Sequence, residues 1–471
     1  MAVTTEHLTR VTMRNNVALL AQTVVLQLVS AVALLVLSRI SGSAGYAHYA
    51  VAMSVCTLAY ACIIPMTRAL VRARPTLPSL ADSGAASVIM LCFVVVGAFA
   101  FAVSWFHAEA SIPTIGAGIV YTVGLAATIP ATATLQRQLR LARAGYLTLV
   151  DRISFPLTII PALLLGFPMT SAIIVAFIAS TVLNAAAAWI VGRQFWKPAG
   201  LRAALPVCQD AVPLVLMSVL SIAMFSLITP LVSLISGAHE AGLYAWSFSI
   251  IMAIQSILAT IDASIMPAAT HASRVQVTGA LQPITRAVVF MAAVLSLLLL
   301  FAAPVLVGTI FPNRWEDALP ALYTLVVATT VLAGTTSVNA VWNAHFNLRL
   351  QLRIYALSIV LGIVAVAALG PAWGALGAAI GYGVFTLTLF IGMQVAWYAT
   401  TGHRITRAVP CLWMVIIGVV AIIEGQHVHQ PLHLGTATAV TASGLAALLL
   451  VDRGRILVDL RSWVGLARGK H

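Results

Sequence analysis

Long stretches of this chain contain no charged residue, and they restrict its fold more than any other feature. A helix needs about 20 predominantly apolar residues to cross a bilayer, because every backbone amide must find its partner within the segment. Ten charge-free windows each suit one such helix, and two longer windows suit two each. The single windows are 15–38, 40–67, 83–108, 110–136, 211–239, 241–261, 287–313, 318–348, 408–423 and 425–451, and the longer ones are 153–192 and 354–403.

Two proline-containing breaks divide the longer windows. Proline removes a backbone donor and disfavours the helical conformation of the residue before it. Gly166-Phe167-Pro168 therefore divides the first window, and Gly370-Pro371 divides the second. The sequence thus predicts an all-α polytopic membrane protein with about 14 transmembrane helices, which agrees with a composition of 61% apolar and 8% charged residues.

The 25 basic residues indicate which way these helices cross the membrane. Short cytoplasmic loops are enriched in Arg and Lys. With the N-terminus inside, 14 crossings place 23 basic residues in the cytoplasm and leave only Arg39 and Arg314 outside. The sequence therefore predicts cytoplasmic N- and C-termini, and the net charge of +13 reports topology and not nucleic-acid binding.

Some kinds of chemistry are excluded by what the chain lacks. Its two lysines, Lys197 and Lys470, do not follow the glycine spacing of a phosphate-binding loop, so the chain is not itself an ATPase. Its five cysteines form no Cys-x-x-Cys pair. Three unevenly spaced histidines, His427, His429 and His433, are typical of a solvated loop. We therefore expect no metal site and no cofactor.

A repeat at an offset of 195 residues relates the two halves of the chain. Residues 38–54 and 233–249 are identical at seven of 17 aligned positions. Because six predicted helices separate the copies, the halves have the same orientation, as in transporters built from parallel repeats. The sequence predicts two six-helix bundles, 1–205 and 206–400, in a parallel pseudo-twofold arrangement, followed by two additional helices and a basic cytoplasmic tail in 401–471.

Three segments carry a resemblance to a known family. They are Leu37-Ser38-Arg39-Ile40-Ser41-Gly42 leading into Tyr46-Ala47-His48-Tyr49-Ala50, its echo from Gly237 to Ala245, and the late Gly374-Ala375-Leu376-Gly377-Ala378-Ala379. The chain resembles the polysaccharide (O-antigen type) flippase family, whose superfamily also contains multidrug-and-toxin exporters and lipid II flippases. That family has two six-helix bundles and usually two added C-terminal helices.

The resemblance implies a role in surface polysaccharide assembly, such as that of lipopolysaccharide O-antigen or exopolysaccharide. The protein would move undecaprenyl-pyrophosphate-linked oligosaccharide across the bacterial cytoplasmic (inner) membrane by alternating access. H⁺ and Na⁺ are the candidate coupling ions, and the sequence leaves open whether an ion or the membrane potential supplies the drive. Its partners would be the lipid-linked oligosaccharide, membrane lipids, a polysaccharide polymerase and glycosyltransferases. No catalytic role is expected of it.

Polar side chains on the predicted helices are candidates for a substrate cavity. Asn16, Thr23 and Gln27 follow helical spacing on one face, and we take Leu37 as a lipid-facing reference. The alternative is that such groups join packed helices by hydrogen bonds worth about 1 kcal/mol each. Arginines near helix ends could bind the pyrophosphate. The other cavity candidates are Ser218, Gln255, Asn339, Trp342 and Asn343, and the arginines are Arg39, Arg68 and Arg152.

One carboxylate is a candidate for ion coupling. Asp262 lies seven residues after Gln255 on a predicted helix, and ionisable groups inside the membrane are costly and so often functional. A structural pair with a cytoplasmic arginine such as Arg274 remains the alternative for Asp262.

Two other classes of function remain open. A multidrug or cation antiporter of the same superfamily would be marked by a paired acidic site deep in one bundle. A glycan polymerase or ligase would need catalytic groups on a large external loop, and all predicted external loops are short.

Overall fold

The part of the chain that the structure describes is almost entirely helical. The computed structural model describes residues 141–192, 224–271, 274–309, 313–345 and 348–402 continuously, and residues 25–54, 116–135, 216–222 and 311 in part. No strand occurs in these ranges, which agrees with the predicted all-α class. The chain divides into two compact units, which we call the N-terminal unit (18–234) and the C-terminal unit (235–471 with 1–17).

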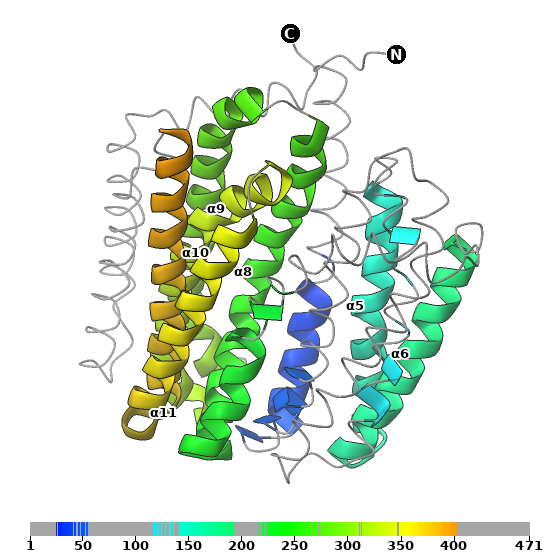
Figure 1. The fold of residues 1–471 in the computed structure, drawn as a ribbon. Coiled ribbons are helices and arrows are strands. Elements are labelled where there is room, and N and C mark those ends of the chain that lie inside the picture. The colour runs from blue at the N-terminus through cyan, green and yellow to red at the C-terminus, as the bar shows by residue number, and fades with distance from the viewer. Residues whose placement is uncertain are drawn as a thin grey trace. The chain divides into compact units, whose positions relative to one another are not determined.

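Two helices of the N-terminal unit form an antiparallel hairpin. α5 spans Leu141–Leu164 and α6 spans Met169–Gly192, and the two lie side by side (Figure 1). Gly166, between them, has a φ of 84°, and the Phe167 N–H donates to the carbonyl of Ala162 at 3.1 Å. The predicted break at Gly166-Phe167-Pro168 is confirmed. The predicted start of this helix at 153 is wrong, because α5 already begins at Leu141 and includes charged residues that the window excluded.

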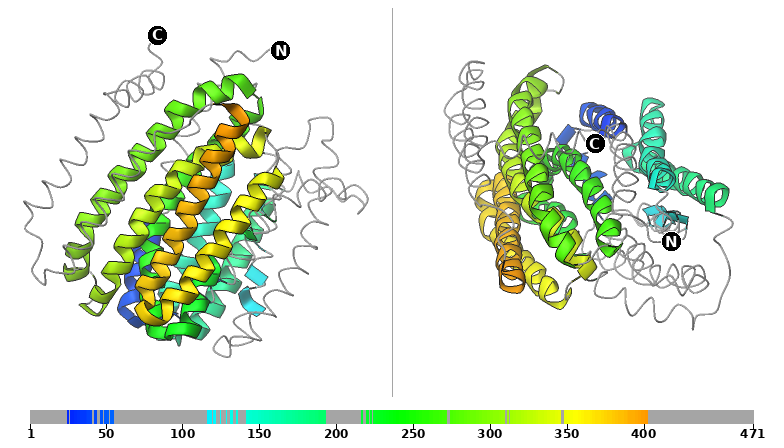
Figure 2. Two further views of the ribbon diagram at one scale, coloured as in Figure 1. Left: turned by 60° about the vertical axis from the view of Figure 1, so that its left-hand side comes forward. Right: turned by 90° about the horizontal axis from the view of Figure 1, so that it is seen from above.

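In the described part of the C-terminal unit, four long helices run side by side (Figures 1 and 2). α10 is its central helix, because it packs against α8, α9 and α11 and 72% of its apolar span is buried. Each helix extends beyond or close to the ends of its predicted window. The elements are α8 (Ala238–His271), α9 (Arg274–Thr309), the short 3₁₀ helix η2 (Asn313–Ala318), α10 (Leu319–His345) and α11 (Leu348–Thr401).

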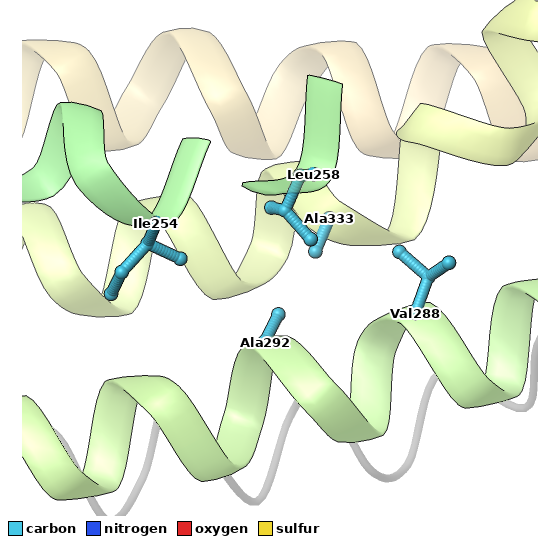
Figure 3. Close-up of a cluster of buried hydrophobic side chains, with 5 residues drawn as sticks. All are labelled: Ile254, Leu258, Val288, Ala292 and Ala333. Carbon is cyan, nitrogen blue, oxygen red and sulfur yellow. The ribbon is translucent and has the colours of Figure 1, made fainter. Parts of the chain in front are cut away.

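Small and branched side chains hold three of these helices together. Ile254 and Leu258 of α8 point toward Val288 and Ala292 of α9, with Ala333 of α10 completing the cluster (Figure 3). Alanines at two of the five positions let the helix backbones approach closely, which favours dispersion contacts in a helical membrane bundle.

α11 is itself a hairpin of two helices. At Gly374 the backbone leaves the helical conformation, with φ 51° and ψ −125°. The halves then pack so closely that a Cβ atom on Gly381 would lie 2.8 Å from the backbone nitrogen of Val366, and one on Gly392 would lie 2.6 Å from Cγ2 of Ile354. The predicted division of this window is confirmed, with the sharp bend a few residues after Gly370-Pro371.

The corner of the α11 hairpin is hydrogen-bonded to the start of α8. Ser236 Oγ donates to the carbonyl of Gly370 at 2.9 Å, and the Ala375 N–H donates to Glu240 Oε2 at 2.8 Å. Glu240 thereby caps the first turn of the second half of α11, where a carboxylate also interacts favourably with the helix dipole. Two short segments, 236–240 and 370–375, are thus joined at both ends.

We expect Glu240→Ala to lower the free energy of unfolding by about 1 kcal/mol, the usual cost of losing a cap. Glu240→Gln keeps an oxygen that can accept from Ala375, so it should lose less. Thermal unfolding of the purified protein in detergent measures both variants. Equal stability of Glu240→Ala and wild type would show that the cap contributes nothing.

Only part of the predicted helix count is tested. Five helices in the described ranges are long and apolar enough to span a membrane. One of them, α11, consists of two helices joined at the bend at Gly374. The total of 14 therefore stays a prediction, as does the pseudo-twofold relation of the bundles. One local feature accords with the repeat: Gly42 and Gly237, which occupy equivalent positions, both have positive φ, at 68° and 89°.

Candidate functional site

A buried carboxylate lies inside the N-terminal unit. Asp151 belongs to α5 and falls within the apolar span Arg143–Leu164, yet only 5% of its surface is exposed. The Tyr121 hydroxyl donates to Asp151 Oδ1 at 3.2 Å. Carboxylates at membrane depth are rare and mark ion paths and proton relays. Asp151 is therefore the strongest candidate for a functional group in the described residues.

Two polar side chains on α6 add unpaired oxygens to this region. Ser180 and Asn184 are fully buried and lie one turn apart. The Ser180 hydroxyl and both amide atoms of Asn184 have no hydrogen-bond partner among the residues that the structure describes. A buried polar atom without a partner costs about 1–3 kcal/mol, so it calls for an explanation such as a bound ion or water.

The register of the α5–α6 hairpin places these groups at the level of Asp151. On one side of Asp151, the rings of Phe155 and Phe177 pack with centroids 5.1 Å apart. On the other side, Leu147 belongs to the same cluster as Ala187. Asp151 thus lies opposite the α6 turn that carries Ser180 and Asn184, because residues three or four apart share a helix face.

A third segment closes this region. Tyr121 stacks on Phe177 with ring centroids 5.3 Å apart. A Cβ atom on Gly124 would lie 2.9 Å from the Cα of Thr181, so the segment around Tyr121 packs directly on α6. A carboxylate, two hydroxyls and an amide from three segments thus lie at one level of the unit, and oxygen atoms of these kinds can bind a proton or a monovalent cation. We call Tyr121, Asp151, Ser180 and Asn184 the carboxylate site.

Polar groups of the C-terminal unit are joined to one another. Gln255 Nε2 donates to the Tyr382 hydroxyl at 2.8 Å and lies 3.4 Å from the Thr329 hydroxyl. Asn339 Nδ2 donates to the Tyr355 hydroxyl at 2.8 Å. The Gln255 amide thus links α8 to α11, and the Asn339 amide links α10 to α11. This placement fits the interhelical alternative that the sequence left open, while their accessibility to substrate remains a prediction.

The structure describes the other predicted residues unevenly. Gln27 is half-buried and Arg39 is exposed, whereas Trp342 and Asn343 are buried within the C-terminal unit. Leu37 is 1% exposed, so its choice as a lipid-facing reference was wrong. Of Arg152 and Asp262 only the helical backbone is described. Asn16, Thr23, Arg68 and Ser218 lie outside the described residues.

We expect a cysteine placed at Gln27 to react with a water-soluble thiol reagent, because the cavity hypothesis places this amide beside water. The measurement needs a background in which the five native cysteines are replaced. Leu28, 64% exposed on the same helix, is the matched control for a lipid-facing position. Equal protection of both cysteines would remove Gln27 from the cavity.

Sequence reasoning missed the carboxylate site because it ended helices at charged residues. With the helix starting at 153, Asp151 stood at a membrane boundary beside Arg152. The true start of α5 at Leu141 puts Asp151 well inside the helix. Two prolines, Pro156 and Pro161, lie inside α5, and nothing in the sequence pattern indicated that the helix begins as early as Leu141.

Comparisons with known proteins identify the fold. No protein-family model and no curated protein matches the chain. A solved structure of an outward-facing multidrug resistance MATE family transporter of the MOP superfamily is 15% identical, with 91% of this chain and 100% of that chain covered and a TM-score of 0.56. A mutant form of the Vibrio cholerae MATE transporter VcmN is 13% identical, with 83% of this chain and 97% of that chain covered and a TM-score of 0.56.

A third solved structure, a MATE in complex with MaD3S, is 14% identical, with 86% of this chain and 100% of that chain covered and a TM-score of 0.57. These neighbours come from the superfamily that the sequence resemblance indicates, while the resemblance to the polysaccharide flippase family stays a prediction. The chain has the fold of the MATE transporters and is a multi-pass helical membrane protein.

Proposed function

We propose that this protein is a cation-coupled exporter of organic substrates, in which a proton or a monovalent cation bound at the carboxylate site drives alternating access. The observation that carries the proposal is the burial of Asp151 inside a membrane span, together with unpaired oxygens at the same level of α6. The MATE neighbours supply the fold in which such coupling would operate.

The physical basis is a difference in affinity between two states. A cation can shift a conformational equilibrium only if it binds one state more tightly than the other. Asp151 can provide that difference, because its carboxylate is costly to hold in a dry environment unless a proton or cation neutralises it. If the cation is released on the side of the membrane where the protein binds substrate more tightly, substrate replaces the cation, and the two are exchanged across the membrane.

The substrate class of this proposal differs from the first expectation of the sequence. The fold neighbours favour the multidrug or cation antiporter over the lipid-linked oligosaccharide flippase. Among the described residues, Asp151 with its polar neighbours is the proposed counterpart of the paired acidic site expected for such an antiporter.

A flippase for lipid-linked oligosaccharide is the second candidate, and one observation favours it. Two charge-free windows, 408–423 and 425–451, follow the last described helix, as expected for the added helices of the flippase family. In this candidate the protein acts in the bacterial inner membrane, with cytoplasmic termini and glycan-assembly partners, and Asp262 is its predicted coupling residue.

Reconstituted proteoliposomes distinguish the two candidates. One assay follows transport of a fluorescent organic cation under an imposed pH or sodium gradient. The other follows protection of a fluorescent undecaprenyl-pyrophosphate oligosaccharide from a membrane-impermeant reagent. The exporter proposal predicts gradient-dependent transport in the first assay. Translocation in the second assay alone would replace it with the flippase.

A further inference from the structure

The C-terminal unit contains a second buried polar cluster, and this one is made only of neutral side chains. Asn339 of α10 contacts Gln351 and Tyr355 of the first half of α11, and Asn343 lies one turn further along α10. Gln351 Nε2 donates to Asn339 Oδ1 at 3.3 Å, and Asn339 Nδ2 donates to the Tyr355 hydroxyl at 2.8 Å. These bonds hold the amide of Asn339 in place at both its oxygen and its nitrogen.

Two oxygens of the cluster are buried without a partner. Gln351 is 1% exposed and Asn343 is 3% exposed. Gln351 Oε1 and Asn343 Oδ1 have no hydrogen-bond partner within the described ranges. Both atoms are acceptors. Gln351 contacts Asn339 directly, and Asn343 lies one helical turn after Asn339, so both residues lie beside the same amide along α10.

The chemistry of these atoms limits what can bind between them. Two acceptors need a donor or a cation. The four side chains carry no charge, which disfavours a divalent ion, whereas uncharged carbonyl-type oxygens replace the hydration shell of monovalent cations in membrane proteins. α10 ends at His345, so its last carbonyls add partial negative charge next to Asn343.

We propose that Asn343 and Gln351, held in place by Asn339 and Tyr355, bind one monovalent cation such as Na⁺ or K⁺. This amide site belongs to the C-terminal unit and uses none of the residues of the carboxylate site. A cation there connects the end of α10 to the first half of α11 and stabilises their packing.

The test measures thermal unfolding of the purified full-length protein in NaCl, KCl or choline chloride at equal ionic strength. All samples carry Asp151→Asn, so that a cation at the carboxylate site does not contribute. We expect Na⁺ or K⁺ to raise the unfolding midpoint over choline by about 2 °C or more, because a ligand that binds only the folded state stabilises it. No increase in either salt would overturn the proposal and leave the oxygens to water.

Asn343→Leu is the decisive variant, because it keeps the approximate size of the side chain and removes its oxygen. The amide site predicts that the difference between Na⁺ or K⁺ and choline disappears in this variant. If the unpaired oxygen were only a structural cost, Asn343→Leu would be stabilised equally in all three salts and would keep the difference. Asn343→Asp, which adds a negative charge, should enlarge the difference, and a smaller one would contradict the proposal. None of these results depends on whether Asp151 couples transport.

Discussion

Asp151→Asn is expected to reduce gradient-driven transport about tenfold or more, because the driving cation loses its charged ligand. The asparagine keeps the size of the side chain and an oxygen that can accept a hydrogen bond from Tyr121. It has no acidic group, so it can neither take up a proton as a carboxylate does nor neutralise the charge of a cation. Transport of the organic cation in proteoliposomes with and without a gradient measures the effect. Asp151→Glu, which retains the carboxylate, should keep part of the activity.

The control for this experiment is the amount of folded protein in the membrane. Asp151→Asn should be present at the wild-type level and should still bind substrate, because the hydrogen bond from Tyr121 can persist. Asp262→Asn tests the residue that the sequence alone favours, in the same assay. Full coupling in Asp151→Asn together with its loss in Asp262→Asn would transfer the coupling role to α8.

Gly381→Val is expected to be among the most destabilising single substitutions in the C-terminal unit, with a loss of about 3 kcal/mol. Its Cβ atom would meet the backbone nitrogen of Val366 at 2.8 Å and the carbonyl oxygen of Gly362 at 3.0 Å. Backbone atoms cannot rotate away as a flexible side chain can, so the two halves of α11 would have to separate.

Gly383→Ala is the matched control on the same half of α11. The nearest atom to its new Cβ would be the Cβ of Ala328, at 4.0 Å. It should be neutral or slightly stabilising, since alanine favours the helix over glycine by up to about 1 kcal/mol. Thermal unfolding in detergent compares the two variants. Similar midpoints for Gly381→Val and Gly383→Ala would show that the close contact between the halves of α11 does not stabilise the unit.

The sequence predicts the helices well where their ends coincide with prolines and glycines. The first divided window is confirmed at Gly166-Phe167-Pro168, where Gly166 has a positive φ. The second window is divided as predicted, but at Gly374, because the helix continues through Pro371 and the backbone leaves the helical conformation only at this glycine with positive φ. Helix starts are less predictable. The start of α5 at Leu141 could not be read from a rule that excludes every charged residue from a span.

The candidate site depends on tertiary contacts that no local pattern contains. Asp151 is recognised as a site residue only through its hydrogen bond from Tyr121, thirty positions earlier in the chain, and through the α6 turn at the same level. The sequence predicts Gln255 and Asn339 as residues of a substrate cavity, and that role stays a prediction. The sequence could not show that their amides are engaged by Tyr382 and Tyr355, since these contacts join helices distant along the chain.

The central claim, that substrate and cation exchange at Asp151, is tested most directly by measuring cation release when substrate binds. Purified protein in weak buffer is mixed with the organic cation that it transports, and a pH indicator and a sodium-selective electrode record what leaves. Because coupling between two ligands is reciprocal, the account predicts release of about one H⁺ or Na⁺ per wild-type molecule and none from Asp151→Asn. Equal release from both proteins, or substrate binding without any release from wild type, would contradict it.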